Sequence, residues 1–164
     1  MSKKTTVVIG IGNADRGDDA IGLLVARRLR DVTLPDVHVY ESSGDPAGLM
    51  EKWGTGQSVI AIDAMVTGGE PGSIRIIDAF EIDATAAMFH SQSTHAFGLA
   101  EAVRLARALE SLPSHFTVVG IEGQSFEVGA PLSPLVGSAL KQAVEAVNRL
   151  LEASENHKPE TSHA

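Results

Sequence analysis

The sequence predicts a single α/β domain in which helices cover both faces of a mostly parallel β-sheet. Apolar, β-branched runs of strand length alternate along the chain with longer segments of helical periodicity. The 164 residues are 43% hydrophobic but only 4% aromatic, so Val, Ile, Leu and Ala must build the core, as in layered α/β proteins. The length suits one domain. We therefore expect a three-layer α/β/α fold with a five-stranded sheet, of the phosphorylase/hydrolase-like type.

Five apolar or alternating segments are predicted as strands, at residues 5–11, 37–41, 58–64, 72–78 and 116–122. The third of them, SVIAIDA, is the most apolar, which predicts a central place in the sheet. Only a short, glycine-rich link joins Asp63 to Gly72, whereas a parallel crossover needs a dozen or more residues. We therefore expect the third and fourth strands to form an antiparallel pair.

Helices are predicted at 18–30, 46–53 and 95–111, with a last helix from Ser133-Pro134 to about residue 152. Ser133 suits an N-cap, and Pro134 and Pro46 suit the first helical turn. Residues 80–94 give no clear pattern. The polar segment 153–164 is predicted to be a disordered tail, which leaves a domain of residues 1–152.

Charge and composition exclude several kinds of partner and chemistry. The formal net charge of −8 disfavours nucleic acid, whose phosphates are bound by clustered Lys and Arg. The chain has no cysteine, which excludes disulfides and thiolate catalysis and is compatible with the cytoplasm. No apolar run approaches membrane-spanning length, and the N-terminus lacks a signal-peptide pattern. We expect a cytoplasmic monomer that binds neither nucleic acid nor membrane.

The glycine-rich turn GIGNADRGDDAIG, residues 10–22, follows the first predicted strand. A dinucleotide-binding fingerprint would need a third glycine where this chain has Asp15, and Glu41 is a weak candidate for a ribose contact. A purely structural interpretation explains the glycines as a tight exit from the strand and Asp18 as a helix N-cap. Asn13 is expected to tie the turn through side-chain hydrogen bonds. Asp19 fits a helix-dipole partner and a metal ligand equally well.

Three chemically suitable residues are expected at one edge of the sheet. Asp19 follows the first strand, Asp63 ends the third, and His95 begins the helix that leads into the fifth. Sites in open α/β sheets lie outside the carboxyl ends of the parallel strands. Two carboxylates and an imidazole suit a divalent transition metal and leave room for a substrate or water. Asp63 could instead cap a turn, and His95 could lie on a helix surface; His38 and His90 are weaker candidates.

Four pieces of sequence in this order resemble the nickel–iron hydrogenase maturation proteases. They are GIGNADRGDDAIG, AIDAM with GGEPGSI, STHAFGLAEAVRLA and GIEGQSFEVGAPLSPLV, and together they cover roughly residues 6–150. The resemblance implies an α/β/α fold with a mixed sheet. It also implies an endopeptidase that removes the C-terminal extension of a hydrogenase large-subunit precursor after nickel has been inserted. Nickel would be supplied by the substrate, with no organic cofactor.

The resemblance also implies roles for individual residues. The metal-recognising positions of the family match Asp19, Asp63 and His95, for which we expect the metal-binding and catalytic roles. We expect Gly12, Asn13 and Asp18 to position the substrate. The family often has Glu at the position of Asp19, so the carboxylate here is shorter by one methylene. A second departure, ESSGDPAGL at residues 41–49, predicts a different hydrogenase partner.

Other functions remain open on the sequence alone. Peptidyl-tRNA hydrolases share the G-x-G-N turn, but this chain lacks their following Pro and basic segment. A nucleotide-binding module without peptidase activity and a docking protein without activity are further alternatives. The chain has no H-E-x-x-H motif and no convincing serine–histidine pair. Peptide hydrolysis would then depend on water activated by the metal or by one of the carboxylates.

Overall fold

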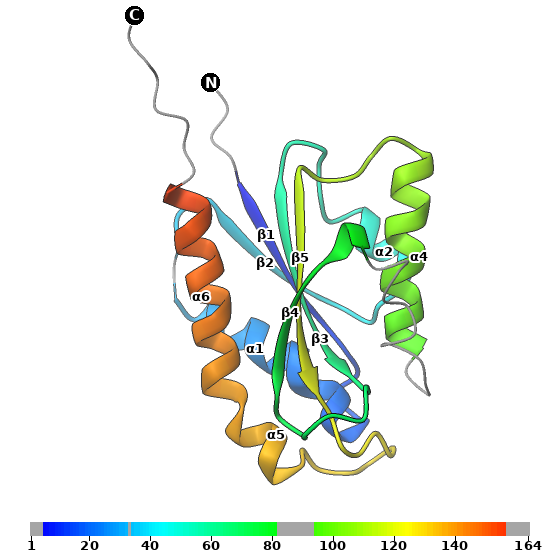
Figure 1. Ribbon diagram of the computed structural model, residues 1–164, viewed down its shortest axis with the longest axis vertical. Helices are drawn as coiled ribbons and strands as arrows, with labels where there is room; N and C mark the ends of the chain where they lie inside the picture. The colour runs from blue at the N-terminus through cyan, green and yellow to red at the C-terminus, as the bar shows by residue number, and fades with distance from the viewer. Residues whose placement is uncertain (1–4, 33, 82–93, 157–164) are drawn as a thin grey trace, which may run out of the picture.

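The computed structural model describes residues 5–32, 34–81 and 94–156, and of residues 94–97 the backbone alone. A five-stranded sheet with the order β2-β1-β3-β5-β4 lies between two helical layers (Figure 1). The strands are β1 (Thr6–Ile11), β2 (Val37–Ser42), β3 (Ser58–Met65), β4 (Ile74–Asp78) and β5 (His115–Glu122). The pairs β1–β2, β1–β3 and β3–β5 are parallel. The predicted sheet, mostly parallel with β3 at its centre, is confirmed.

Strand β4 has the predicted direction but not the predicted neighbour. It pairs antiparallel with β5, in a register that sets Ile74 opposite Ile121, and does not pair with β3. The link after β3 crosses the end of β5, where the amide of Gly72 donates to the carbonyl of Glu122. Strand β5 is almost wholly buried, whereas Arg75 and Ile76 of β4 are exposed. The more apolar strand therefore takes the inner position and β4 becomes the edge.

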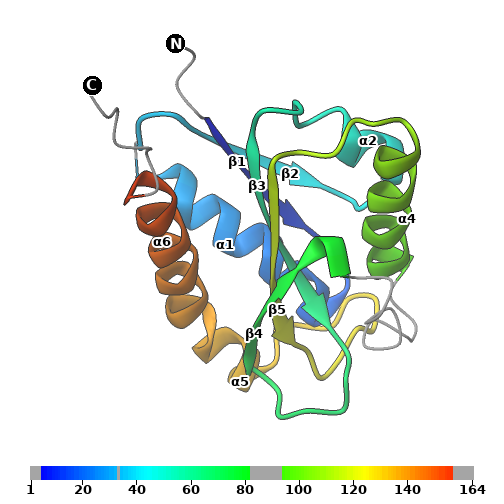
Figure 2. The ribbon, with the colours of Figure 1, turned by 45° about the horizontal axis from the view of Figure 1, so that its top comes forward.

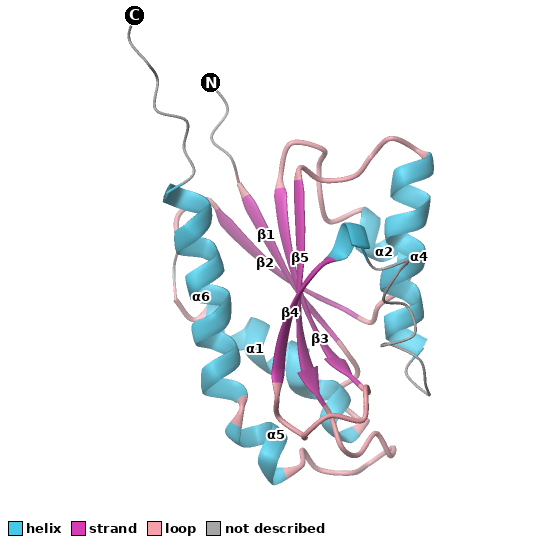
Figure 3. Cartoon of the chain, viewed as in Figure 1, coloured by secondary structure: helices cyan, strands magenta, loops and turns pink. Residues whose placement is uncertain are grey.

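The helices form one layer on each face of the sheet (Figures 2 and 3). They are η1 (Gly17–Ala20), α1 (Ile21–Arg30), α2 (Pro46–Met50), η2 (Ala79–Glu81), α4 (Thr94–Ala108), α5 (Pro134–Ser138) and α6 (Leu140–Asn156). Helices α1 and α6 lie together on one face, and α2 and α4 lie together on the other. Pro46 and Pro134 begin their helices as predicted. None of the helices in the described ranges is long and apolar enough to cross a membrane.

The last helix differs from its prediction in two respects. It is interrupted at Ala139, which separates α5 from α6, because the amide of Ala139 bonds the carbonyl of Val136 in a tighter turn. Helix α6 then continues to Asn156, four residues beyond its predicted end at about residue 152. Residues 80–94 have no clear sequence pattern, and only residues 80, 81 and 94 of this segment are described. His90 lies outside the described residues.

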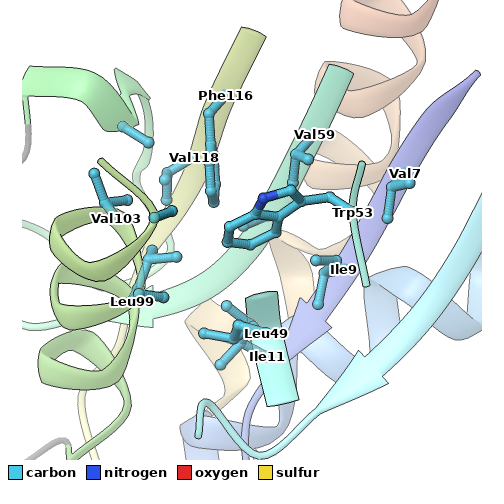
Figure 4. Packing of buried hydrophobic residues seen from close by; sticks show 14 of the residues in the cluster. Val7, Ile9, Ile11, Leu49, Trp53, Val59, Leu99, Val103, Phe116 and Val118 are labelled. Carbon is cyan, nitrogen blue, oxygen red and sulfur yellow. The ribbon is translucent and has the colours of Figure 1, made fainter. Parts of the chain in front are cut away.

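Two apolar cores fill the space between the layers. One joins α2 and α4 to the sheet, and its sixteen buried residues include Leu49, Trp53, Leu99 and Phe116 (Figure 4). The indole of Trp53 meets the ring of Phe116 edge-on, with the centroids 5.2 Å apart. The second core joins α1, α5 and α6 to the opposite face of the sheet. The inner strands β1, β3 and β5 are therefore buried on both faces and form a rigid base for the loops at their ends.

The carboxyl ends of the parallel strands meet at one edge, which we call the carboxyl edge. Helix α4 begins at the end of the sheet toward which the arrowheads of β3 and β5 point (Figure 1). The same edge carries η1, the 66–73 loop after β3 and the 123–133 loop after β5. The predicted convergence of these chain segments is therefore present in the fold, as expected for an open α/β sheet.

Candidate active site

Asp63 lies near the end of the central strand and is fully buried. Its neighbours Ala61 and Met65 belong to the core beneath α2 and α4, while Ile62 and Ala64 belong to the opposite core. Because side chains alternate along a strand, the Asp63 carboxylate points toward the layer that contains α4. A carboxylate there is costly to bury unless a cation or hydrogen-bond donors compensate it. This makes a role as a turn cap the weaker explanation of Asp63.

Asp19 is also fully buried, in the short helix η1, which packs against β3. Gly12 makes this position possible, because a Cβ atom at residue 12 would collide with the carbonyl oxygen of Asp19. Gly22 has a similar effect in α1, since a Cβ there would collide with the carbonyl oxygens of Ile11 and Ile62. The glycines of the turn thus bring the start of α1 directly onto the ends of β1 and β3.

His95 belongs to the first turn of α4, and its side chain lies outside the described part of the structure. The backbone places that turn at the carboxyl edge, on the face toward which Asp63 points. Three residues along, Gly98 meets the backbone of Gly44, and a Cβ atom at Gly98 would collide with the Gly44 carbonyl oxygen. The start of α4 is therefore held closely against the loop that follows β2.

Asn13 stabilises the turn, as expected. Its Oδ1 accepts a hydrogen bond from the amide of Asp15 at 2.9 Å, which is a local turn of the kind that Asn commonly makes. The prediction that Asp18 is an N-cap is wrong. Arg16 precedes η1, and Asp18 lies inside that helix with its side chain turned toward the 123–133 loop. Long-range hydrogen bonds have replaced the local cap.

The Asp18 carboxylate fastens the 123–133 loop to the turn that carries Asp19. It accepts four hydrogen bonds of 2.7–2.9 Å, from the amides of Gln124, Ser125 and Ser133 and from the Ser133 hydroxyl. Burial raises the pKa of the Asp18 carboxyl, but these hydrogen bonds lower it by more. The pKa therefore lies below its ordinary value, and the group is an anion when the loop is in place.

Glu122, which the sequence did not single out, is a fourth buried carboxylate at this edge, after Asp18, Asp19 and Asp63. It accepts hydrogen bonds from the amide and hydroxyl of Thr67, both at 2.8 Å, and from the amide of Gly68 at 3.1 Å. Glu122 thereby fixes the loop that follows Asp63. An acid at the end of an apolar strand was the signal that selected Asp63, and the same signal in GIEG could have identified Glu122.

The geometry brings Asp19 and Asp63 to one edge of the sheet, and α4 begins at the same edge. Among the described side chains, which do not include His95, no group of three His, Cys, Asp or Glu residues could hold a metal ion. The three-ligand site thus remains a prediction. Two buried carboxylates with a nearby histidine can in principle bind a divalent metal or hold and move a proton. His38, one of the weaker candidates, is exposed on β2.

Comparisons with known proteins point to one family. The model of the hydrogenase maturation protease family matches residues 24–150. The hydrogenase 2 maturation protease of Escherichia coli K12 is 31% identical over 153 residues, which cover 90% of this chain and 91% of that protein. The structure of a hydrogenase-maturating endopeptidase of Escherichia coli superposes with a TM-score of 0.81 and 26% identity, over 92% and 93% of the two chains. A [NiFe] hydrogenase maturation protease of Thermococcus kodakarensis superposes with a TM-score of 0.65 and 26% identity, over 92% and 94%.

Proposed function

Because the chain belongs to the hydrogenase maturation protease family, we propose that it recognises nickel in its substrate through Asp19, Asp63 and His95. The chain is an endopeptidase that cleaves the C-terminal extension of the large subunit of a nickel–iron hydrogenase. Family membership removes the nucleotide-binding and tRNA-hydrolase alternatives.

The observation that carries the proposal is the complete burial of two carboxylates, Asp19 and Asp63, at the edge where α4 begins. A buried carboxylate has its strongest stabilising partner in a cation or in charge-assisted hydrogen bonds. Oxygen and imidazole ligands suit nickel, and three protein ligands leave coordination positions for groups of the substrate. Asp19, Asp63 and His95 would therefore bind nickel that the precursor already holds.

A weak, open ligand set agrees with a checking role. A tight site would retain nickel permanently, and the enzyme could no longer distinguish a loaded precursor from an empty one. Binding energy that is gained only with loaded precursor would instead place the scissile peptide bond against the site. Metal bound there can polarise a carbonyl group or lower the pKa of water, and a carboxylate can accept the proton of the attacking water.

The test compares nickel-loaded and nickel-free large-subunit precursors, with cleavage followed by the mass of the C-terminus. We expect the wild-type protein to shorten only the loaded precursor. Asp19→Asn, Asp63→Asn and His95→Gln should each abolish cleavage and leave the circular dichroism spectrum unchanged. Asp15→Asn and His115→Gln change exposed residues of the same types and serve as matched controls.

Two results would contradict the proposal in separate ways. Efficient cleavage of nickel-free precursor would disprove recognition of the metal. Wild-type rates in all three site variants would remove the residue assignment while leaving the family's activity in place. We also propose that the protein acts as a monomer in the cytoplasm, which light scattering and cell fractionation can check.

A further inference from the structure

Arg16 occupies a distinctive place in the turn between β1 and η1. Its carbonyl oxygen accepts a hydrogen bond from the amide of Asp19 at 3.1 Å, so it lies within one turn of a candidate metal ligand. Its side chain is partly exposed and reaches the 123–133 loop, where Nε donates to the carbonyl of Phe126 at 3.3 Å. The contact with Phe126 limits the freedom of this long side chain.

The outer part of the Arg16 side chain is available to a ligand. Within the described ranges, its two terminal nitrogens donate no hydrogen bond, and no carboxylate forms an ion pair with it. Arginines elsewhere in the chain do form such pairs, for example Arg27 and Arg30 with Glu41. A guanidinium that is held through Nε and free at both terminal nitrogens presents a planar fork suited to a carboxylate.

The surroundings of Arg16 are otherwise acidic. Arg16 is the only Lys or Arg in segments 12–20, 43–45, 66–73 and 123–133, which form the loops and turns of the carboxyl edge. These segments and the adjacent strand ends contain nine acids: Asp15, Asp18, Asp19, Glu41, Asp45, Asp63, Glu70, Glu122 and Glu127. Such an edge attracts cations and repels anions. Any anionic group of the substrate that approaches it has one favourable partner among the basic side chains of these segments.

We propose that Arg16 binds a carboxylate of the C-terminal extension and thereby helps to set the register of the extension at the site. Every C-terminal extension ends in an α-carboxylate and can also contain acidic side chains, so the substrate supplies the required chemistry. The inference rests on the proposed function, because the extension must lie across this edge to be cut there. Arg16 is thus a substrate-binding residue beside the candidate metal ligands, and it acts on binding more than on the chemical step.

The alternative is a purely structural role, in which Arg16 only anchors the 123–133 loop through Phe126. Two substitutions separate the explanations. Arg16→Gln removes the charge, whereas Arg16→Lys keeps the charge and removes the Nε contact with Phe126. Arg149→Gln is the matched control, because it changes the net charge equally in α6, where that side chain is 76% exposed and 3.9 Å from Glu145.

The experiment measures KM and kcat for nickel-loaded precursor at about 0.05 M and 0.3 M salt, where screening differs strongly. We expect Arg16→Gln to raise KM about tenfold with kcat little changed, and to weaken the dependence of KM on salt. Arg16→Lys should lose less affinity and keep the salt dependence. A precursor with the acidic side chains of its extension changed to amides shows which carboxylate is bound. If wild-type enzyme has a higher KM for this amide precursor than for the unchanged precursor, Arg16 binds an acidic side chain of the extension. If the two precursors have the same KM with wild-type enzyme and Arg16→Gln still raises KM, Arg16 binds the terminal carboxylate.

Equal KM values and salt dependences for Arg16→Gln and Arg149→Gln would overturn the inference. A loss in Arg16→Lys as large as in Arg16→Gln, with a lowered melting temperature in both, would assign Arg16 to loop anchoring instead. In either case the wild-type enzyme still cleaves loaded precursor. Failure of the wild-type enzyme to do so would count against the proposed function itself, so the two failures are distinguishable.

Discussion

The carboxylate of Asp18 accepts hydrogen bonds from both the amide and the hydroxyl of Ser133, at 2.7 and 2.8 Å, across 115 residues of sequence. This relationship joins the turn after β1 to the start of α5. The amide of Asp18 in turn donates to the carbonyl of Ser125 at 2.9 Å. The turn that carries Asp19 and the 123–133 loop are therefore one unit, and disturbing either should displace the other.

Replacing Asp18 by Asn should loosen the 123–133 loop. An amide has one acceptor oxygen where the carboxylate has two, so donors that now bond Asp18 would face an NH₂ group. We expect a loss of about 2 kcal/mol or more in the free energy of unfolding, measured with urea. Amide exchange at Gln124, Ser125 and Ser133 should become faster. Asp15→Asn, an exposed acid of the same turn, should change neither quantity, and equal effects of the two substitutions would argue against the clamp.

Replacing Gly12 by Ala should separate the end of β1 from η1. The new methyl group would collide with the carbonyl oxygen of Asp19, and a backbone atom cannot move aside as a flexible side chain can. We expect a loss of about 1–3 kcal/mol in the free energy of unfolding and a reduced rate of precursor cleavage. Gly56→Ala is the control, because no atom lies within 4 Å of its added Cβ. A neutral Gly12→Ala would show that the close approach is unimportant.

The elements of the fold follow from local patterns, and these could be predicted. Continuous apolar runs mark β1, β3 and β5, and Pro46 and Pro134 mark where helices begin. Which strands lie next to each other in the sheet could not be fully predicted. The short link after β3 fixes the direction of β4, but it cannot show that β5, far along the chain, will lie between them. The interruption at Ala139 is equally hidden, because the apolar stripe of the helix continues through it.

In the candidate site, too, some features could be predicted from the sequence and others could not. Asp19 and Asp63 could be selected because acids at the ends of apolar strands converge at one edge of an α/β sheet. The partners of Asp18 could not, since they lie 106 to 115 residues away and no local pattern encodes them. A local role, the N-cap, was the natural prediction for Asp18, and long-range contacts displaced it.

Replacing Glu122 by Gln should loosen the 66–73 loop, which follows Asp63. Glu122 now accepts from Thr67 with both carboxylate oxygens, and a Gln side chain must present an NH₂ group to one of those donors. The loss in the free energy of unfolding should be about 1–3 kcal/mol. Glu127→Gln alters an exposed acid five residues away and should have almost no effect. Equal melting temperatures for the two variants would contradict this role of Glu122.

Glu41, near the carboxyl end of the edge strand β2, should make stability depend on pH. Arg27 donates to its Oε1 at 2.8 Å and Arg30 to its Oε2 at 3.0 Å. The hydrogen bonds from Arg27 lower the pKa of Glu41 most; burial raises it, and Arg30 lowers it further, so the pKa lies below its ordinary value of 4.5. A depressed carboxyl pKa adds stability above 4.5, and that stability is lost as the pH falls through the folded-state pKa.

The contribution of the Glu41 charge to the free energy of unfolding is measured by comparing wild type with Glu41→Gln. At neutral pH the variant should be less stable by about 1 kcal/mol or less, because the arginine partners are half exposed and solvent screens the pair. The difference should shrink as the pH falls below 4.5, and it should also shrink in concentrated salt. Glu145→Gln removes the ion pair in α6 between Glu145 and the exposed Arg149, whose charged atoms are 3.9 Å apart. Its free energy of unfolding should differ little from that of wild type at any pH. If the difference in the free energy of unfolding between wild type and Glu41→Gln stays constant as the pH falls, the carboxylate charge does not cause that difference.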